Sequence, residues 1–550
     1  MKILTDALTL LEQRLQDSHN RSRCSVLGAS IFVYICEIMK TGKIVAIPAL
    51  ALAAVSCADN KTSQNPNVLL IIADDLGLGD VSAYGSNTIS TPNIDNLAEN
   101  GIRFNNGYAT SATSTPSRYG LMTGMYPWRN ENAKILPGDA PLLIPTDMPT
   151  MPKMFQNAGY ETAAIGKWHL GMGAGNVDWN KEIVPSANTV GFDYTCLIAA
   201  TNDRVPTVYV EDGMVEGLEA DDPIYVSYQQ NFEGEPTALT HPEMMKMKWY
   251  DGHFNTIVNG IPRIGFMKGG QKARWVDEDM ADYFVAKVKR FFQERDKDKP
   301  FFLYYGLHQP HVPRAPHQRF VGATDMGPRG DAVVEADWCV GEVLAYMEKE
   351  GLLENTLVIF TSDNGPVVND GYADDSEERL GSHDPRNGTR GGKYSQFDGG
   401  SHIPLIFYWK GKLTPMVSNA IVSQHDFFAS LGRLIGGEVP EGIDSQDHLD
   451  AFLGESLNGR TGLVHEAQGA LSYRNERYSL VPPYVGPATD KTLNELGNLG
   501  EWGVFDLQDN YFEQHNIAKE DPQLLENLKE EFRKALAGLS EEKLKKAGLL

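Results

Sequence analysis

Disulfide chemistry, long apolar runs and positive charge are all scarce in this chain. Its 550 residues include five cysteines, with no disulfide framework and no Cys/His spacing typical of a zinc site. No apolar run reaches the roughly 18 to 20 residues that span a bilayer. The formal net charge is −24 at pH 7, and such a field repels polyanions. These scarcities argue against a disulfide scaffold, a transmembrane protein and a nucleic-acid partner.

The region that starts at Met39 resembles an export signal. Lys40 and Lys43 precede an apolar stretch over residues 44–55, and small residues lead to Cys57. This order predicts a lipoprotein whose Cys57 carries a lipid, exported to the periplasm or to the outer membrane and cell surface, with the lipid as its only membrane contact. The predicted divisions are a mis-called extension at 1–38, or else a true extension with an apolar segment, then a signal peptide at 39–57 and a linker at 58–66.

The remaining chain is predicted to fold as α/β, with a mostly parallel sheet covered by helices on both faces. Its hydrophobic content is 41%, enough for a large core, and short apolar runs alternate with helical segments. In open parallel sheets, ligands bind beyond the carboxyl ends of the strands. Four runs end in polar residues that are therefore expected to converge, namely 68–73 before Asp74 and Asp75, 162–165 before Lys167 and His169, 301–305 before His308 and His311, and 357–362 before Asp363 and Asn364.

The acidic residues after two of these runs predict a metal site. Asp74, Asp75, Asp363 and Asn364 offer only oxygen ligands, and the three carboxylates would repel one another unless a cation lay between them. Hard divalent ions prefer oxygen ligands of this kind. The expected ion is Ca²⁺, with Mg²⁺ as the second choice.

The stretch Ser114–Gly124, STPSRYGLMTG, carries the most specific signal. A proline suits the first turn of a helix, whose free amides favour an anion, and Arg118 lies one turn from Ser114. The plain alternative is an N-capped helix with a solvated arginine. The pattern Ser-x-Pro-x-Arg followed by Thr-Gly resembles the sulfatase signature, in which the first residue is oxidised to formylglycine.

This resemblance implies both a cofactor and a partner protein. The hydrate of the formylglycine at position 114 would attack the sulfur of a sulfate ester, and Ser114 would also complete the metal shell. A serine at this position, instead of a cysteine, implies maturation by the serine-type sulfatase-maturating enzyme, an anaerobic radical enzyme. The resemblance therefore points to a bacterial, oxygen-poor origin.

The resemblance also assigns roles to residues outside the signature. Lys167 and Lys393 would bind the sulfate, His169 would take a proton from the aldehyde hydrate, and His311 would protonate the leaving oxygen. The relatives are arylsulfatase A-like enzymes, and the likeness is strong from Asn67 to about Gly436. The implied fold is alkaline phosphatase-like, with a catalytic domain at 67–455 and a smaller antiparallel-sheet-plus-helix domain at 456–550, which includes an amphipathic helix over 522–537.

The substrate is the least determined property. Family members often carry Glu and Arg where this chain has Asp398 and His402. The long segment 176–270 is expected to wall the sulfate site, with bidentate sugar recognition by Asp203, Arg204 and His253 and possible stacking on Trp179, Trp249 and Tyr250. Resemblance to galactosamine-type sulfatases favours exo-action on terminal galactose or N-acetylgalactosamine 6-O-sulfate, then 4-O-sulfate, in mucin or chondroitin-like glycans.

Two other functions remain open at this point. A phosphoesterase on the same scaffold would prefer phosphate esters, but the related phosphoesterases lack the x-Pro-x-Arg context and use a second metal held by histidines. A lipid-anchored binder of sulfated glycans would bind without turnover, and it would have no need for His169, Lys167 and Arg118 together with acidic metal-ligand pairs.

Overall fold

The computed structural model describes residues 65–508, 513–546 and 549. The predicted extension, the signal peptide with Cys57 and nearly all of the predicted linker lie outside these residues. The described part belongs to one compact unit that begins at Asn65. None of the helices in these ranges is both long enough and apolar enough to cross a bilayer.

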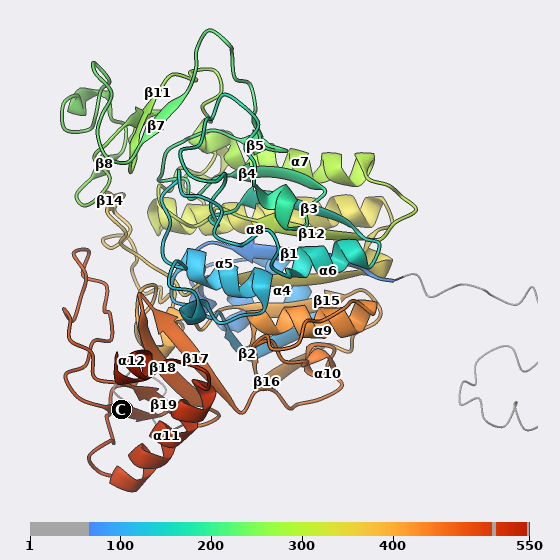
Figure 1. Ribbon diagram of the computed structural model, residues 1–550, viewed down its shortest axis with the longest axis vertical. Helices are drawn as coiled ribbons and strands as arrows, with labels where there is room; N and C mark the ends of the chain where they lie inside the picture. The colour runs from blue at the N-terminus through green and yellow to red at the C-terminus, as the bar shows by residue number, and fades with distance from the viewer. Residues whose placement is uncertain (1–64, 509–512, 547–548, 550) are drawn as a thin grey trace, which may run out of the picture. The chain divides into compact units, whose positions relative to one another are not determined.

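A ten-stranded sheet organises the larger part of the chain, in the order β16-β2-β15-β13-β1-β12-β3-β4-β5-β6 (Figure 1). The first eight strands of this order pair in parallel except at β15, and β5 and β6 add an antiparallel edge beyond β4. The predicted α/β architecture is thus confirmed. The strands are β1 (Asn67–Ala73), β2 (Ile102–Tyr108), β3 (Glu161–Lys167), β4 (Tyr194–Ile198), β5 (Val210–Glu211), β6 (Met214–Val215), β12 (Phe301–Gly306), β13 (Thr356–Ser362), β15 (Leu405–Trp409) and β16 (Met416–Ser423).

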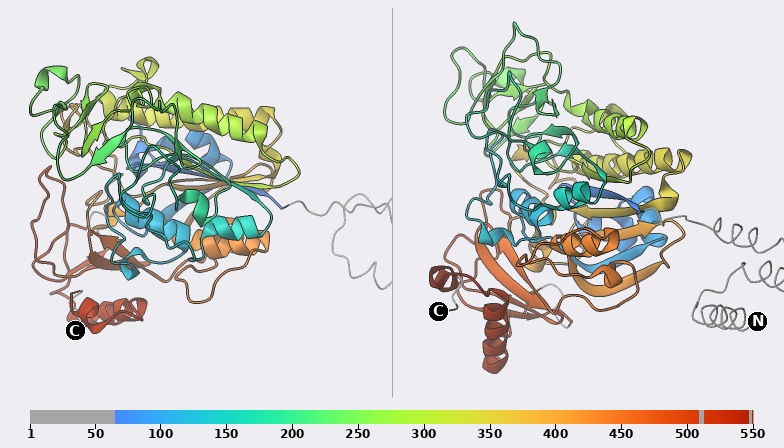
Figure 2. Two further views of the ribbon diagram at one scale, coloured as in Figure 1. Left: turned by 45° about the horizontal axis from the view of Figure 1, so that its top comes forward. Right: turned by 45° about the vertical axis from the view of Figure 1, so that its right-hand side comes forward.

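Helices cover both faces of this sheet (Figure 2). Strand β1 shows why, since Val68, Leu70 and Ile72 join one core while Leu69 and Ile71 join the other. Successive side chains of a strand point to opposite faces, so a strand buried on both faces is apolar throughout. The first core includes α5 (Ser114–Thr123), α6 (Met151–Asn157), α9 (Phe427–Ile435) and α10 (Leu449–Phe452), and the second α4 (Pro92–Glu99), α7 (Met280–Glu294) and α8 (Gly327–Lys349).

A long excursion between β4 and α7 carries short two-stranded ribbons. One ribbon pairs the excursion with the loop that follows β13, because Trp249 of β8 lies opposite Tyr372 of β14. The two long irregular segments are therefore tied together above the sheet. The ribbon strands are β7 (Tyr225–Ser227) with β11 (Phe266–Lys268), β8 (Lys248–Trp249) with β14 (Tyr372–Ala373), and β9 (Ile257–Val258) with β10 (Ile261–Pro262).

The C-terminal part is a four-stranded antiparallel sheet with a helix packed on it, as predicted. Helix α11 begins at Pro522, Asp521 accepts a hydrogen bond from the Leu524 amide, and the helix buries Leu528 and Phe532. The Phe532 ring lies 5.7 Å from the ring of Tyr473 on the sheet. The elements are β17 (Gly462–Ala467), β18 (Ala470–Asn475), β19 (Tyr478–Val481), β20 (Gly503–Asp506), α11 (Pro522–Ala535) and α12 (Glu541–Lys546).

Candidate active site

The predicted site residues follow the carboxyl ends of four neighbouring strands of the large sheet. Strands β13, β1, β12 and β3 are adjacent and parallel. Asp363 follows β13, Asp74 follows β1, His311 lies beyond β12, and Lys167 is the last residue of β3. The four apolar runs that the sequence singled out are therefore side by side, and the polar residues after them meet in space.

Ser114 opens helix α5 at this edge. Thr113 caps the helix in an extended conformation, and Gly124 ends it with a φ of 66°, in the left-handed region that glycine adopts without strain. The Arg118 Nε atom donates to Ser114 Oγ at 3.1 Å and lies 3.0 Å from Asp363 Oδ2. Arg118 is fully buried, so the solvated-arginine alternative is wrong.

His169 is oriented as a proton acceptor toward Ser114. Its Nε2 atom lies 3.0 Å from the carbonyl oxygen of Leu136, which can only accept, so Nε2 carries a proton. Its Nδ1 atom, 3.2 Å from Ser114 Oγ, therefore presents a lone pair. Burial and the neighbouring Lys167 hold the pKa of His169 well below its usual range, so this imidazole is neutral near pH 7.

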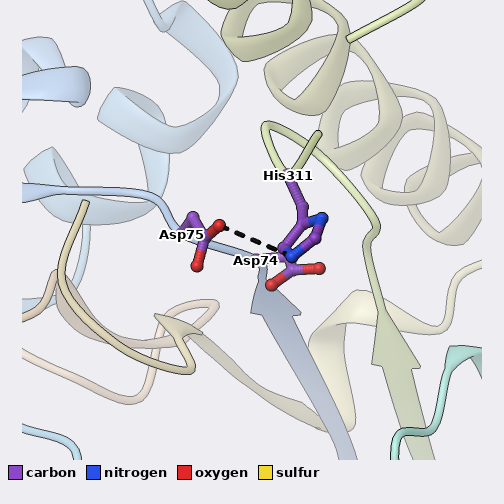
Figure 3. A group of neighbouring side chains, drawn as sticks. All are labelled: Asp74, Asp75 and His311. Atoms are coloured by element: carbon purple, nitrogen blue, oxygen red, sulfur yellow. Dashed lines mark ion pairs between the residues drawn. The ribbon is translucent and has the colours of Figure 1, made fainter. Parts of the chain in front are cut away.

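His311 faces the same point from the loop after β12. Its Nδ1 donates to the Val312 carbonyl oxygen at 2.6 Å, which leaves Nε2 turned toward Asp75, 3.8 Å from Oδ2 (Figure 3). Burial first, and Lys393 second, lower the pKa of His311. His311 belongs with Asp74 and Asp75 to a group whose ligand atoms lie within 4.8 Å of one another.

Buried charge of both signs fills the rest of the site. Lys167 Nζ lies 2.6 Å from Asp74 and 3.4 Å from Asp363, and Lys393 Nζ lies 2.8 Å from Asp75. Burial raises the pKa of Asp74 and of Asp75, whereas Lys167 and Arg118 outweigh the burial of Asp363 and hold its pKa below the usual range. Burial thus disfavours the ionised forms of Asp74 and Asp75, and a bound divalent cation would stabilise them.

The donor set fits a metal ion. Asp74 Oδ2 and Asn364 Oδ1 are buried and accept no hydrogen bond, whereas Asp74 Oδ1 is paired with the Lys167 ammonium. Buried polar atoms without partners are costly, and they are expected where an ion supplies the missing interaction. Asn364 also donates to Asp75 Oδ1 at 2.7 Å, which holds the two predicted ligands together.

A cavity of about 80 Å³ lies over Ser114. Its walls include the predicted catalytic residues His169 and His311 and the three residues predicted for bidentate sugar recognition. The structure therefore brings the excursion after β4 over Ser114, as the sequence analysis expected. The lining residues are Ser114, Ile135, His169, Asp203, Arg204, His253, Ile264, His311, Asp370, Lys393 and Tyr394.

The predicted sugar-binding residues form one hydrogen-bonded group. Asp203 receives a hydrogen bond from Arg204 Nη1 at 2.8 Å and lies 3.0 Å from His253 Nε2. Arg204 and His253 keep the pKa of Asp203 well below its usual range despite its burial. An ionised acceptor beside a guanidinium matches a pair of neighbouring sugar hydroxyls, one donating and one accepting.

Asp370 and Tyr394 were not identified from the sequence. The Tyr394 hydroxyl donates to Asp370 Oδ1 at 3.0 Å, and Lys393 Nζ lies 2.9 Å from Asp370 Oδ2. Tyr394 has a φ of 74°, unusual for a bulky residue, and such strain gathers at functional sites. Its position next to Lys393 was the available signal, whereas Asp370 lies in an acidic loop without a recognisable pattern.

Three aromatic residues expected to stack on a sugar do not line this cavity. Trp179 is 2% exposed and belongs to the core, so its assignment was wrong, while Trp249 ends strand β8 and Tyr250 follows it. His308, which follows the same strand as His311, is buried outside the cavity, and its pKa falls to about 4 through burial.

A buried cluster anchors the long loop that carries Asp370. Arg329 of α8 binds Asp80 through two hydrogen bonds of 2.7 Å, and His383 of the loop binds the same carboxylate at 2.8 Å. Asp80 ends the short helix Leu78–Asp80, which follows Asp74 and Asp75 closely in the chain. The loop is therefore fixed to the same segment that carries Asp74 and Asp75.

Comparisons with known proteins agree with this geometry. A family model described as Sulfatase matches residues 66–437. The chain is 47% identical over 477 residues to an N-acetylgalactosamine-6-O-sulfatase of Bacteroides thetaiotaomicron, covering 86% of this chain and 93% of that protein. It is 30% identical to arylsulfatase A of Bos taurus, covering 78% and 76% of the two chains.

A solved structure extends the agreement to three dimensions. A protein from a study of glycosaminoglycan metabolism by Bacteroides thetaiotaomicron superimposes with a TM-score of 0.84 at 47% identity, over 86% of this chain and 99% of that chain. The range that the family model matches, residues 66–437, includes every residue that lines the cavity over Ser114.

Proposed function

This chain belongs to the sulfatase family and hydrolyses sulfate esters, and from that premise we propose that its substrate is a glycan ending in galactose or N-acetylgalactosamine 6-O-sulfate, with 4-O-sulfate second. The printed name of the 47% identical relative supports this choice. The pocket supports it too, because Asp203, Arg204 and His253 face Ser114 across a space that admits a sulfate and one edge of a sugar.

We propose that Ser114 is oxidised to formylglycine by a serine-type maturating enzyme. The observation that carries this proposal is the position of Ser114 Oγ between Arg118 Nε and the lone pair of His169 Nδ1. The modified residue would supply an oxygen nucleophile for sulfur and a second hydroxyl whose deprotonation frees the sulfate. His169 would accept that proton, while Arg118 would hold the nucleophile through a charge-assisted hydrogen bond.

His311 would serve the leaving alcohol. Its Nε2 atom is turned toward the reacting point, and an arriving sulfate adds negative charge that raises the proton affinity of the ring. Lys167 and Lys393 would balance charge on the sulfate oxygens. Together these residues would bind the anion, transfer protons at both ends of the reaction and exclude water from a buried pocket.

We propose Ca²⁺ as the resident ion, with Mg²⁺ as the second choice. Asp74, Asp75, Asp363 and Asn364 would hold it together with residue 114, and the unpartnered atoms Asp74 Oδ2 and Asn364 Oδ1 support this set. When bound, the ion would orient a sulfate oxygen and withdraw charge from sulfur. The ring of His311 borders the same carboxylates but is assigned to the leaving group.

We also propose export and lipid anchoring at Cys57. The support is the sequence alone, since a charged start, a short apolar stretch and small residues precede that cysteine. Globomycin treatment of the native host should block cleavage before Cys57. Labelling with an alkyne fatty acid should mark the wild-type protein and leave Cys57→Ser unlabelled.

Two measurements test the catalytic proposal. In protein matured with the serine-type enzyme, the peptide that contains residue 114 should be lighter by about two mass units, the two hydrogens lost on oxidation. That protein should hydrolyse galactose and N-acetylgalactosamine 6-O-sulfates faster than the 4-O-sulfates. His253→Ala should lose the preference for the galacto configuration, while the exposed-site control His241→Ala should keep it. Full activity with an unmodified serine, or activity confined to glucosamine or uronate sulfates, would contradict the proposal.

A further inference from the structure

The pocket over Ser114 is too small for a whole sulfated sugar. Its volume is about 80 Å³, whereas sites that enclose small ligands measure about 300 to 1,000 Å³. The sulfate and one edge of the ring fill it, so the remaining substrate must lie outside. Ile135, which is 37% exposed, lines this pocket and also a second, much larger cavity of about 1,110 Å³.

The larger cavity lies between the nucleophile helix and the C-terminal sheet. One wall contains Thr113 and Pro116 of the first turn of α5, and the opposite wall contains Gln468 of the β17–β18 turn and Tyr484 beyond β19. We name this cavity the C-terminal groove. It begins beside the reacting residue and is bounded by a part of the chain to which the reaction assigns no role.

The wall of the C-terminal groove is tied to the segment that precedes Ser114. The amide of Ala112 donates to the Glu466 carbonyl oxygen at 2.8 Å, and Ser111 Oγ donates to Glu466 Oε2 at 2.6 Å. The Ser472 hydroxyl adds a hydrogen bond of 2.9 Å to the Gln396 carbonyl oxygen. The groove is therefore held at a constant place relative to the nucleophile, as an extended binding site requires.

The lining of the groove suits sugar rings that carry no charge. Tyr484 is 40% exposed and Val485 is fully exposed, and both can cover the apolar face of a ring. The amide of Gln468 can bind hydroxyls. The charged residues that line the groove are one lysine, Lys134, and two glutamates, Glu131 and Glu466. The groove therefore has no cluster of cations that could bind a carboxylate.

We infer that the C-terminal groove binds uncharged sugar residues linked to the sulfated sugar whose sulfate occupies the small pocket. This inference rests on the proposed function, because it takes the sulfated sugar to be bound over Ser114. It adds that the enzyme prefers a terminal sulfated sugar on a neutral oligosaccharide to the same sugar joined to a uronate. The electrostatic reason is that the groove has two glutamates and a single lysine, in a chain of net charge −24 that repels a uronate.

The test compares three substrates that share one sulfated sugar, namely the monosaccharide, a neutral oligosaccharide and an oligosaccharide with an adjacent uronate. The kcat/KM for the neutral oligosaccharide should exceed that for the monosaccharide by roughly tenfold, the value of one or two added hydrogen bonds. Tyr484→Ala and Gln468→Ala should each lower the oligosaccharide value by about fivefold and leave the monosaccharide value unchanged. Tyr225→Ala, which removes an exposed tyrosine from the β7 ribbon, is the matched control.

The results separate the inference from the proposed function. Inactivity on every sulfated galacto-sugar would contradict the proposed function. The inference can still be tested then, by calorimetry with the unsulfated neutral oligosaccharide, where the two groove variants should bind more weakly than the wild type. Equal oligosaccharide rates in wild type and groove variants, or a preference for the uronate chain, would overturn the inference. Unaltered binding of the unsulfated oligosaccharide by the variants would do the same.

Discussion

Glu513 should make the stability of this protein fall as pH rises from about 4.5 to about 8. Its side chain is fully buried beside Asp398, whose backbone amide donates to Glu513 Oε2 at 2.8 Å. The Asp398 carboxylate is already paired with His402 at 2.7 Å and with Arg474 at 3.2 Å. Burial first, and this neighbouring carboxylate second, raise the pKa of Glu513 to about 8, against the lowering influence of Ser479 and Arg390.

The sign follows from the direction of the shift. A glutamate whose pKa is raised on folding binds a proton more tightly in the folded protein than in the unfolded one. Its contribution is therefore complete below about pH 4.5, the ordinary value, and is lost as pH rises through about 8. The free energy of unfolding changes by about 1.4 kcal/mol per pH unit across this window, with a ceiling of roughly 5 kcal/mol.

The variant Glu513→Gln replaces the carboxyl group with a neutral group of the same shape. It should match the wild type at pH 5 and exceed its thermal midpoint at pH 8 to 9, because the variant has no proton to lose. Unfolding is followed by tryptophan fluorescence at both pH values. Glu476→Gln, at an exposed position between β18 and β19, is the control and should follow the wild type. If wild type and Glu513→Gln showed the same pH dependence, the reasoning about this buried carboxyl would be refuted.

Three further substitutions test the site and its support. Asp363→Ala should leave Arg118 and Lys167 without a shared partner and weaken metal binding by several kcal/mol. The variant should be nearly inactive, and a chelator should lower the activity of the wild type. An unchanged rate in metal-free buffer would contradict the assignment. His169→Ala should lower kcat by about 100-fold or more, with sulfate retained on residue 114 in mass spectra; normal turnover would exclude His169 as the proton acceptor. Arg329→Met should strand the buried Asp80 carboxylate and lower the free energy of unfolding by about 3 to 5 kcal/mol in urea titrations, whereas Arg319→Met, at a more exposed pair, should cost under about 1 kcal/mol.

Local chemistry made several features predictable from the amino-acid order. Strands such as β1 and β13 are apolar throughout because they are buried on both faces, and ligands follow strands of this kind at their carboxyl ends. The acidic pairs therefore pointed to a shared edge before any contact was known. The start of helix α5 was also predictable from local sequence, because Pro116 and Arg118 occupy fixed positions within one turn of Ser114. Helix α11 was predictable from Pro522 at its start and from its amphipathic spacing.

Long-range packing decided the rest. Asp370 reaches the cavity because Arg329 and His383 anchor its loop through Asp80, three residues that lie far apart in the chain. Trp179 was expected to stack on a sugar ring, but it is buried in the core. Its burial could not be predicted from local sequence because it depends on neighbours from other elements. Glu513 is an ordinary glutamate in the sequence, and its raised pKa exists only because folding seals it against Asp398. Spacing thus determined which residues could react, and tertiary packing determined which residues surround them.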